Sequence, residues 1–198
     1  MNTPVSNRLF ELAEHHGGYF TTQEALDASI SNRVLTHLIS RGALARVAHG
    51  IYRLVAYPDH PHADMLVATL WAGSGSAVSH ESALAVYDLA QAAPPVLHVT
   101  VPRPFRGQRP GVRIHLADLN EGSTRVRDDV PVTSIERTLV DVARSSDHSL
   151  VREAVHESLE RGLTTRRRLT LALGDVQEGR TQVRRTWGVR LSTAEDAR

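Results

Sequence analysis

Apolar and polar positions recur with helical spacing in the N-terminal part of the chain and predict three short helices. The first is expected over residues 7–16, after a Ser6 cap. Thr21 and Glu24, three residues apart, have the pattern of a capping box, so we expect a second helix over 23–28.

A third helix is predicted over residues 32–41, with Ser31 as its N-cap and Gly42 after its last turn. Its apolar residues, at helical spacing, are Leu35, Leu38 and Ile39. The opposite face carries hydrogen-bonding and cationic side chains: Asn32, Arg33, Thr36, His37, Ser40 and Arg41. Such a face suits base edges and phosphates.

A hairpin follows, with His49-Gly50 as a two-residue turn between strands over 44–48 and 51–55. Pairing outward from this turn places Val47 opposite Tyr52 and Arg46 opposite Arg53. Like charges directly across a hairpin repel each other. A DNA phosphate would relieve this repulsion, although both arginines extending into water is the open alternative.

The order helix, turn, helix, hairpin is typical of a winged helix-turn-helix, so we expect DNA binding. Asparagine can recognise adenine, and arginine can recognise guanine, through paired hydrogen bonds. The predicted DNA-binding residues are Thr22, Ser31, Asn32, Arg33, Thr36, His37, Arg41, Arg46, His49 and Arg53.

Two prolines in the stretch 57–62 indicate a link between domains. Beyond it, helices are expected over 64–72, 80–89, 134–144, 149–161 and 165–173, and strands over 77–78, 96–101, 112–116, 125–127 and 130–132. The predicted fold class is α+β, with an N-terminal winged helix-turn-helix followed by a mixed α+β domain. The expected divisions are residues 1–57, residues 62–175 and an Arg-rich C-terminal helix or tail over 176–198.

Composition narrows the function classes only modestly. The chain has 198 residues, no cysteine and a net charge of +1, and all its cationic residues are arginine. The lack of cysteine excludes disulfides, thiolate zinc sites and cysteine nucleophiles. A balanced charge does not by itself favour nucleic-acid binding, so that prediction rests on the arrangement of residues. Without a long apolar run or a signal-peptide pattern, we expect a cytoplasmic protein.

The sequence Ser79-His80-Glu81-Ser82 offers a hydroxyl, an imidazole and a carboxylate, as a catalytic site would. Ser79 stands where a helix N-cap belongs, and adjacent helical residues point about 100° apart. We therefore expect no nucleophile–base pair here and no catalytic residue. Ser134 has the same expected role as a cap.

His60, His62 and Asp64 weakly resemble a set of metal ligands. Zinc needs three or four ligands that converge at bonding distance, and Pro61 and the linker setting argue against this. The histidines elsewhere form no His-x-x-x-His pair. We expect no metal and no cofactor.

Three sequence segments, in this order and at this spacing, resemble the AbiEi family of antitoxins. They are GYFTTQEAL…RGALARVAHGIYRL at 18–54, SHESALAVYDL at 79–89 and PVTSIERTLVDVA at 131–143. The resemblance covers roughly residues 8–175. It implies an N-terminal winged helix-turn-helix joined to an α+β antitoxin domain, binding to inverted repeats in the protein's own promoter, and a nucleotidyltransferase-like toxin as partner.

Two groups of arginines are candidates for contact with such a toxin or another partner. They are Arg103, Arg106 and Arg109 in a Pro- and Gly-rich loop, and Arg166 and Arg167 near the C-terminus. DNA backbone contact and simple solvation are the alternatives.

We therefore expect a non-enzymatic antitoxin that represses its own operon, with double-stranded DNA and the cognate toxin as partners and protomers associating on repeated sites. A stand-alone winged-helix regulator with a ligand-sensing second domain is the alternative. A nucleic-acid enzyme would need an acidic cluster, and the candidates Asp118, Asp128, Asp129 and Asp141 show no recognised spacing.

Overall fold

The computed structural model describes residues 3–145, 147–174 and 187, and the chain divides into two compact units. One comprises Met1–Ser76 with Val126–Pro131, and the other Ala77–Arg125 with Val132–Arg198. The division falls after Ser76 and not at the predicted link over 57–62, because the following helix packs on the first sheet. The predicted C-terminal helix or tail lies outside the described residues, apart from Trp187.

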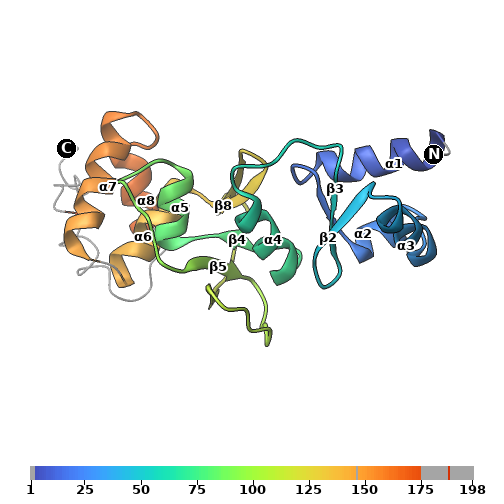
Figure 1. Cartoon of the computed structure of the whole chain (residues 1–198). Helices are drawn as coiled ribbons and strands as arrows, with labels where there is room; N and C mark the ends of the chain where they lie inside the picture. Colours follow the sequence, from blue (N-terminus) through green and yellow to red (C-terminus); the bar gives the residue numbers. More distant parts are fainter. Residues whose placement is uncertain (1–2, 146, 175–186, 188–198) are drawn as a thin grey trace. The chain divides into compact units, whose positions relative to one another are not determined.

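The first unit is a winged helix (Figure 1). Its elements are α1 (Thr3–Glu14), β1 (Tyr19–Thr21), α2 (Thr22–Asp27), α3 (Asn32–Ser40), β2 (Leu44–Ala48), β3 (Ile51–Leu54) and α4 (Ala63–Ala72). The three strands form an antiparallel sheet in the order β1-β3-β2. The helix α1 begins before Ser6, so the predicted cap is wrong, and Leu9 lies in the core while Phe10 is 44% exposed.

The core of this unit joins all three N-terminal helices to the sheet. Its buried residues are Leu9, Ala13, Phe20, Ala25, Ile30, Leu35, Leu38, Leu44 and Leu54. The capping box of α2 is confirmed, because Thr21 Oγ1 accepts from the Glu24 amide and Glu24 Oε2 accepts from the Thr21 amide. Ser31 occupies the N-cap position of α3 as predicted, but its hydroxyl makes no capping hydrogen bond.

The wing turns at His49-Gly50 as predicted, but its predicted register is wrong. Arg46 pairs with Tyr52 and Ala45 pairs with Arg53, so the two arginines do not face each other. The register shifts between Arg46 and Ala48, which leaves Val47 as the extra residue of a β-bulge.

The other elements are β4 (Ala77–Val78), α5 (His80–Val86), β5 (Leu97–Val101), β6 (Val112–Leu116), β7 (Thr124–Arg127), β8 (Val130–Thr133), α6 (Ile135–Ser145), α7 (His148–Glu160) and α8 (Arg166–Gly174). The five strands form a mixed sheet in the order β6-β5-β4-β8-β7. In it, β4 runs antiparallel to β5, and β5 runs parallel to β6. Asp128 and Asp129, both with positive φ, form the predicted turn of the β7–β8 hairpin.

Helices α5–α8 belong to the second unit, where α6 packs against α5, α7 and α8 (Figure 1). Ser134 caps α6 as predicted, since its Oγ accepts from the Arg137 amide at 3.3 Å. The Trp187 indole is 1% exposed and donates to the Leu139 carbonyl at 3.2 Å.

Candidate nucleic-acid interface

Helix α3 has one face in the core and the other in solvent. Leu35 and Leu38 are buried, and Ile39 packs partly buried against the same cluster. The six polar residues predicted to face outward are all exposed: Asn32, Arg33, Thr36, His37, Ser40 and Arg41. The face is therefore open to a partner along the full length of the helix.

Some of these side chains are hydrogen-bonded to the backbone of α3, and others are not. Thr36 Oγ1 donates to the Asn32 carbonyl at 3.0 Å, and Ser40 Oγ donates to the His37 carbonyl at 2.8 Å. Both hydroxyls are thus held by the helix backbone. The cationic groups of Arg33 and Arg41 make no ion pair with any residue that the structure describes.

The wing offers one exposed cation at its tip. Arg46 Nη2 lies 3.0 Å from His49 Nδ1, and both side chains are exposed. The Thr22 amide and hydroxyl both donate to the Gly50 carbonyl, at 2.8 and 3.2 Å, and so tie the turn to the start of α2. The predicted DNA-binding residue Thr22 therefore already serves to position the wing.

Arg53, also a predicted DNA contact, is held inside its own unit. Its side chain is 18% exposed, with Nη2 2.6 Å from Asp59 Oδ1 and 2.9 Å from the Tyr57 carbonyl, to which it donates. These contacts occupy Nη2 of Arg53. The side chain of Arg46, in contrast, is exposed and contacts His49 in the wing. The structure thus distinguishes two arginines that the sequence pattern treats as a pair.

The arginines predicted to contact a toxin or partner lie on two separate elements of the second unit. Arg103 and Arg106 are exposed in the loop over 102–111 between β5 and β6, where Arg109 is half-buried. Arg166 and Arg167 are exposed in the first turn of α8.

A histidine cluster in the second unit was missed by sequence reasoning. His80, His98 and His115 each offer a ring nitrogen, and these atoms all lie within 4.8 Å of one another. His115 Nε2 is 3.1 Å from His98 Nδ1, and the rings of His80 and His115 stack with centroids 3.8 Å apart. Glu81 Oε2 lies 3.3 Å from His98 Nδ1.

The expectation that Ser79 and His80 cannot pair is wrong. Ser79 Oγ lies 3.0 Å from His80 Nδ1 and makes no capping hydrogen bond to α5, although it occupies the N-cap position. His80 has a φ of +52°, outside helical geometry, so the usual 100° rotation between neighbours does not apply. Ser79 is 0% exposed, so this contact with His80 is enclosed within the second unit.

Burial keeps these imidazoles neutral. It lowers the pKa of His80 to about 4, with a further decrease from the neighbouring His98. Burial likewise lowers the pKa of His115 to about 4, and the pKa of His98 is lowered for the same first reason. Each ring can then present a lone pair.

Two of the four acidic residues considered for a nucleic-acid enzyme contact Arg137. Arg137 Nε lies 2.9 Å from both carboxylate oxygens of Asp141, and Arg137 Nη1 donates to the Asp118 carbonyl. Burial raises the pKa of Asp141, against the effect of this arginine. Asp128 and Asp129 form the hairpin turn instead.

The residues proposed as weak metal ligands near the link do not converge. His60 Nδ1 accepts from the His62 amide at 3.0 Å, and His60 Nε2 lies 3.6 Å from Asp129 Oδ2. Among the described residues, the group able to hold a metal ion is the histidine cluster, and it includes neither His60, His62 nor Asp64.

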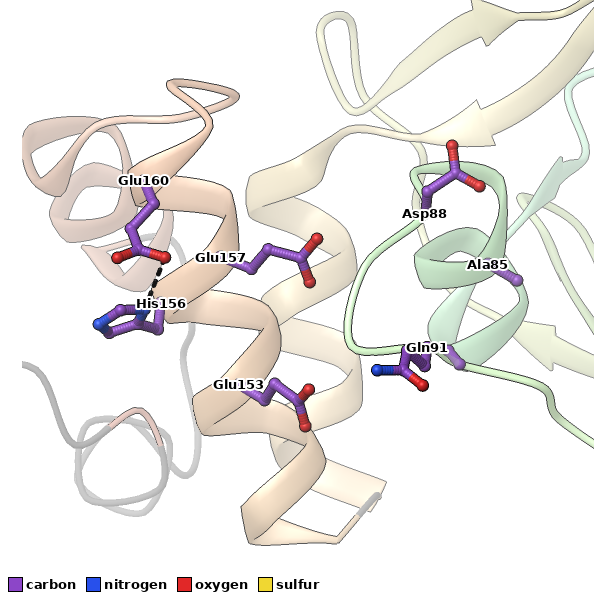
Figure 2. A pocket seen from close by; sticks show the side chains of 8 residues that line it. Ala85, Asp88, Gln91, Glu153, His156, Glu157 and Glu160 are labelled. Carbon is purple, nitrogen blue, oxygen red and sulfur yellow. Dashed lines mark ion pairs between the residues drawn. The ribbon is translucent and has the colours of Figure 1, made fainter.

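An acidic hollow of about 890 Å³ lies between α7 and the loop after α5 (Figure 2). Its acidic lining residues are Asp88, Glu153, Glu157 and Glu160. Glu157 accepts from the Ala90 amide at 2.8 Å, and Arg161 donates to the Asp88 carbonyl at 2.6 Å. One of the four acidic residues therefore has a structural role, because the Glu157 carboxylate holds the loop after α5 against α7.

Residues 7–55, from α1 to the end of the wing, match the family model described as "Transcriptional regulator, AbiEi antitoxin". Over these residues the chain is similar to the AbiEi antitoxin family. The family match confirms the predicted resemblance over this segment, which contains α3 and the wing, and it supports a general role in transcriptional regulation.

A solved structure is similar in fold over a longer part of the chain than residues 7–55. The crystal structure of the RV2827C protein from Mycobacterium tuberculosis aligns with a TM-score of 0.50 and 15% sequence identity, over 95% of this chain and 77% of that chain. At this identity the likeness concerns the fold alone. The comparison with curated proteins gives no match. None of the helices in the described part of the chain has the length and apolar character needed to cross a membrane.

Proposed function

We propose that this chain is a non-enzymatic antitoxin that binds its own promoter through α3 and the wing and counteracts a nucleotidyltransferase-like toxin. The observation that carries the DNA-binding part is the polar face of α3, which is exposed over six residues while the opposite face is buried. The AbiEi match over 7–55 supports the antitoxin role.

The chemistry of α3 suits the major groove. Asn32 and Arg33 stand in its first turn, and these residue types can form paired hydrogen bonds with adenine and guanine. The hydroxyl of Ser31 does not cap the helix, so amide groups of the first turn can donate to a phosphate. Arg46 and His49 would then contact the backbone beside the groove.

One winged helix makes few phosphate contacts. Two protomers on adjacent repeats would bind more tightly than either alone, because the second binding event benefits from the first. We therefore propose that protomers associate on the repeated promoter site.

The DNA-binding proposal is tested with a fluorescent duplex carrying the promoter repeats. Arg33→Ala is expected to weaken binding about 5–150-fold, the range for one base contact of ~1–3 kcal/mol. Arg152→Ala removes an exposed helical arginine of the second unit and is the matched control. Equal affinity of wild type and Arg33→Ala would contradict the proposed groove contact.

The antitoxin proposal is tested by co-expression with the neighbouring gene, scoring growth rescue and co-purification. We expect rescue, and we expect the triple change of Arg103, Arg106 and Arg109 to Ala to reduce it if this loop contacts the toxin. Rescue without co-purification would favour an indirect mechanism. A neighbouring gene that is harmless would favour the stand-alone regulator instead.

We also propose that the chain does not cleave nucleic acid. DNA and RNA incubated with the purified protein and Mg²⁺ or Mn²⁺ are expected to stay intact. Metal-stimulated cleavage that co-purifies with the chain would overturn this part of the proposal.

A further inference from the structure

The histidine cluster is built by three elements that are distant in sequence. His80 begins α5, His98 lies on β5 and His115 lies on β6. In the parallel β5–β6 register, His115 pairs with Thr100, which shares a face of the sheet with His98. The two strand histidines therefore project from the same face.

From this geometry we infer that His80, His98 and His115 bind a divalent transition-metal ion, with zinc as the preferred occupant. Imidazole nitrogens are common zinc ligands, and three of them form a frequent protein set. The structure brings three candidate nitrogens within 4.8 Å of one another.

The separation of two of the nitrogens fits one shared ion. His115 Nε2 and His98 Nδ1 are 3.1 Å apart. Two nitrogens bound to one tetrahedral zinc at ~2.0–2.1 Å stand about 3.3–3.4 Å apart. An ion could therefore replace the proton shared by this pair with little movement of the strands.

Neighbouring side chains orient the rings as outer partners of metal ligands commonly do. Ser79 Oγ contacts His80 Nδ1, which leaves the Nε2 atom of that ring for the ion. Ser82 Oγ accepts from the His98 amide at 2.9 Å and fixes the strand beside α5. Glu81, 3.3 Å from His98 Nδ1, supplies a carboxylate as a fourth ligand or as an outer partner.

The backbone at His80 gives an independent observation. Its φ of +52° is sparsely populated by residues other than glycine, and such positions commonly occur where a side chain must be aimed. In this conformation the His80 ring stacks on that of His115, with 19° between the ring planes. Because an imidazole lone pair lies in the plane of its ring, binding a shared ion would turn the His80 ring out of this stack.

Charges around the cluster act in both directions. Glu81 and Asp141 favour a cation, whereas Arg113 and Arg137 oppose it. Arg137 is already bound to Asp141, and Arg113 is exposed to solvent, which screens its charge.

The test uses the full, untagged chain, metal-free and then dialysed against limiting Zn²⁺. We expect one zinc per chain by elemental analysis, a higher Tm that EDTA reverses, and intense visible absorption of tetrahedral Co²⁺ when cobalt replaces zinc. His115→Phe keeps an aromatic ring against His80 but removes the ligating nitrogen, and should lose the stoichiometric metal. His148→Phe, at an exposed position of α7, is the matched control and should retain it.

A second measurement does not depend on variant folding. On zinc addition to the wild type, the imidazole NMR signals of His80, His98 and His115 should shift together, while those of other histidines stay in place. Less than stoichiometric binding, or shifts confined to other histidines, would overturn the inference. Because no DNA or toxin is present, this outcome is independent of the proposed function.

Discussion

At the residue scale, the carboxylate of Glu24 links the start of α2 to the turn that follows α1. Glu24 Oε2 accepts from the Thr21 amide at 2.7 Å and from Thr21 Oγ1 at 2.8 Å, while Oε1 lies 3.1 Å from His16 Nε2. The hydrogen bond with His16 is the largest cause that lowers the pKa of Glu24 to about 2, followed by the bonds from Thr21, while burial acts in the opposite direction. The charged form of this residue therefore stabilises the fold.

The sign of the resulting pH dependence follows from this lowered pKa. The contribution is fully present above pH 4.5, the ordinary value, and is lost as the pH falls towards about 2. Glu24→Gln should reduce the loss of stability over this window, as measured by urea unfolding at successive pH values. Glu11→Gln, at an exposed position of α1, is the control and should keep the wild-type profile. Parallel profiles for wild type and Glu24→Gln would contradict the assignment.

Local side-chain chemistry also shows what a sequence can reveal at a single residue. The capping box of α2 depends on two residues three apart, and it was predicted from that spacing alone. Ser79 was predicted at the correct N-cap position but with the wrong partner. Its hydroxyl contacts His80 because His80 adopts a positive φ. The residues next to His80 in the sequence do not specify this backbone conformation.

Helices and strands, at the next scale, were largely predictable, whereas their pairing was not. Helix α3 was expected over 32–41 and spans Asn32–Ser40, and β6 was expected over 112–116 and spans Val112–Leu116. Periodicity and caps determine such spans. The wing register was wrong by one residue because a bulge at Val47 depends on contacts across strands, which a turn dipeptide does not specify.

The corrected register gives a prediction that separates the two wing arginines. Arg46→Ala should weaken DNA binding and reduce the salt slope by about one, as expected for one phosphate contact. Arg53→Ala should leave that slope nearly unchanged and instead lower the free energy of unfolding by about 1 kcal/mol, since it loses the Tyr57 carbonyl and a solvent-exposed ion pair with Asp59. Anisotropy titrations at several salt concentrations, with urea unfolding, measure both quantities. Equal salt slopes for the two variants would show that the structural distinction is wrong.

At the scale of the whole molecule, the two candidate sites differ in the sequence separation of their residues. These sites are the exposed face of α3 and the histidine cluster. The exposed face of α3 is local and was predicted residue by residue. The histidine cluster was missed because it depends on β5 pairing parallel with β6 and on α5 beginning beside them. Its residues have no common spacing, so no short motif could identify it.

The buried position of Trp187 leads to a prediction about the stability of the second unit. Its indole is buried and bonded to the Leu139 carbonyl, so Trp187→Ala should destabilise this unit by about 3–5 kcal/mol through the cavity it leaves. Hydrogen exchange should show lost protection in α6 and retained protection in α3. Trp187→Phe, which keeps most of the volume but not the N–H group, should have a smaller effect. Equal protection of α6 in wild type and Trp187→Ala would refute this role.

The bulge at Val47 has a consequence for the behaviour of the protein at high concentration. Strand β2 is an edge strand of the three-stranded sheet. The unpaired amides and carbonyls of an edge strand can pair with a strand of another chain. The irregular backbone at Val47 and the adjacent Arg46 charge oppose such addition. Removing Val47 would straighten this edge strand, and the shortened protein should self-associate into β-rich aggregates more readily than the natural chain.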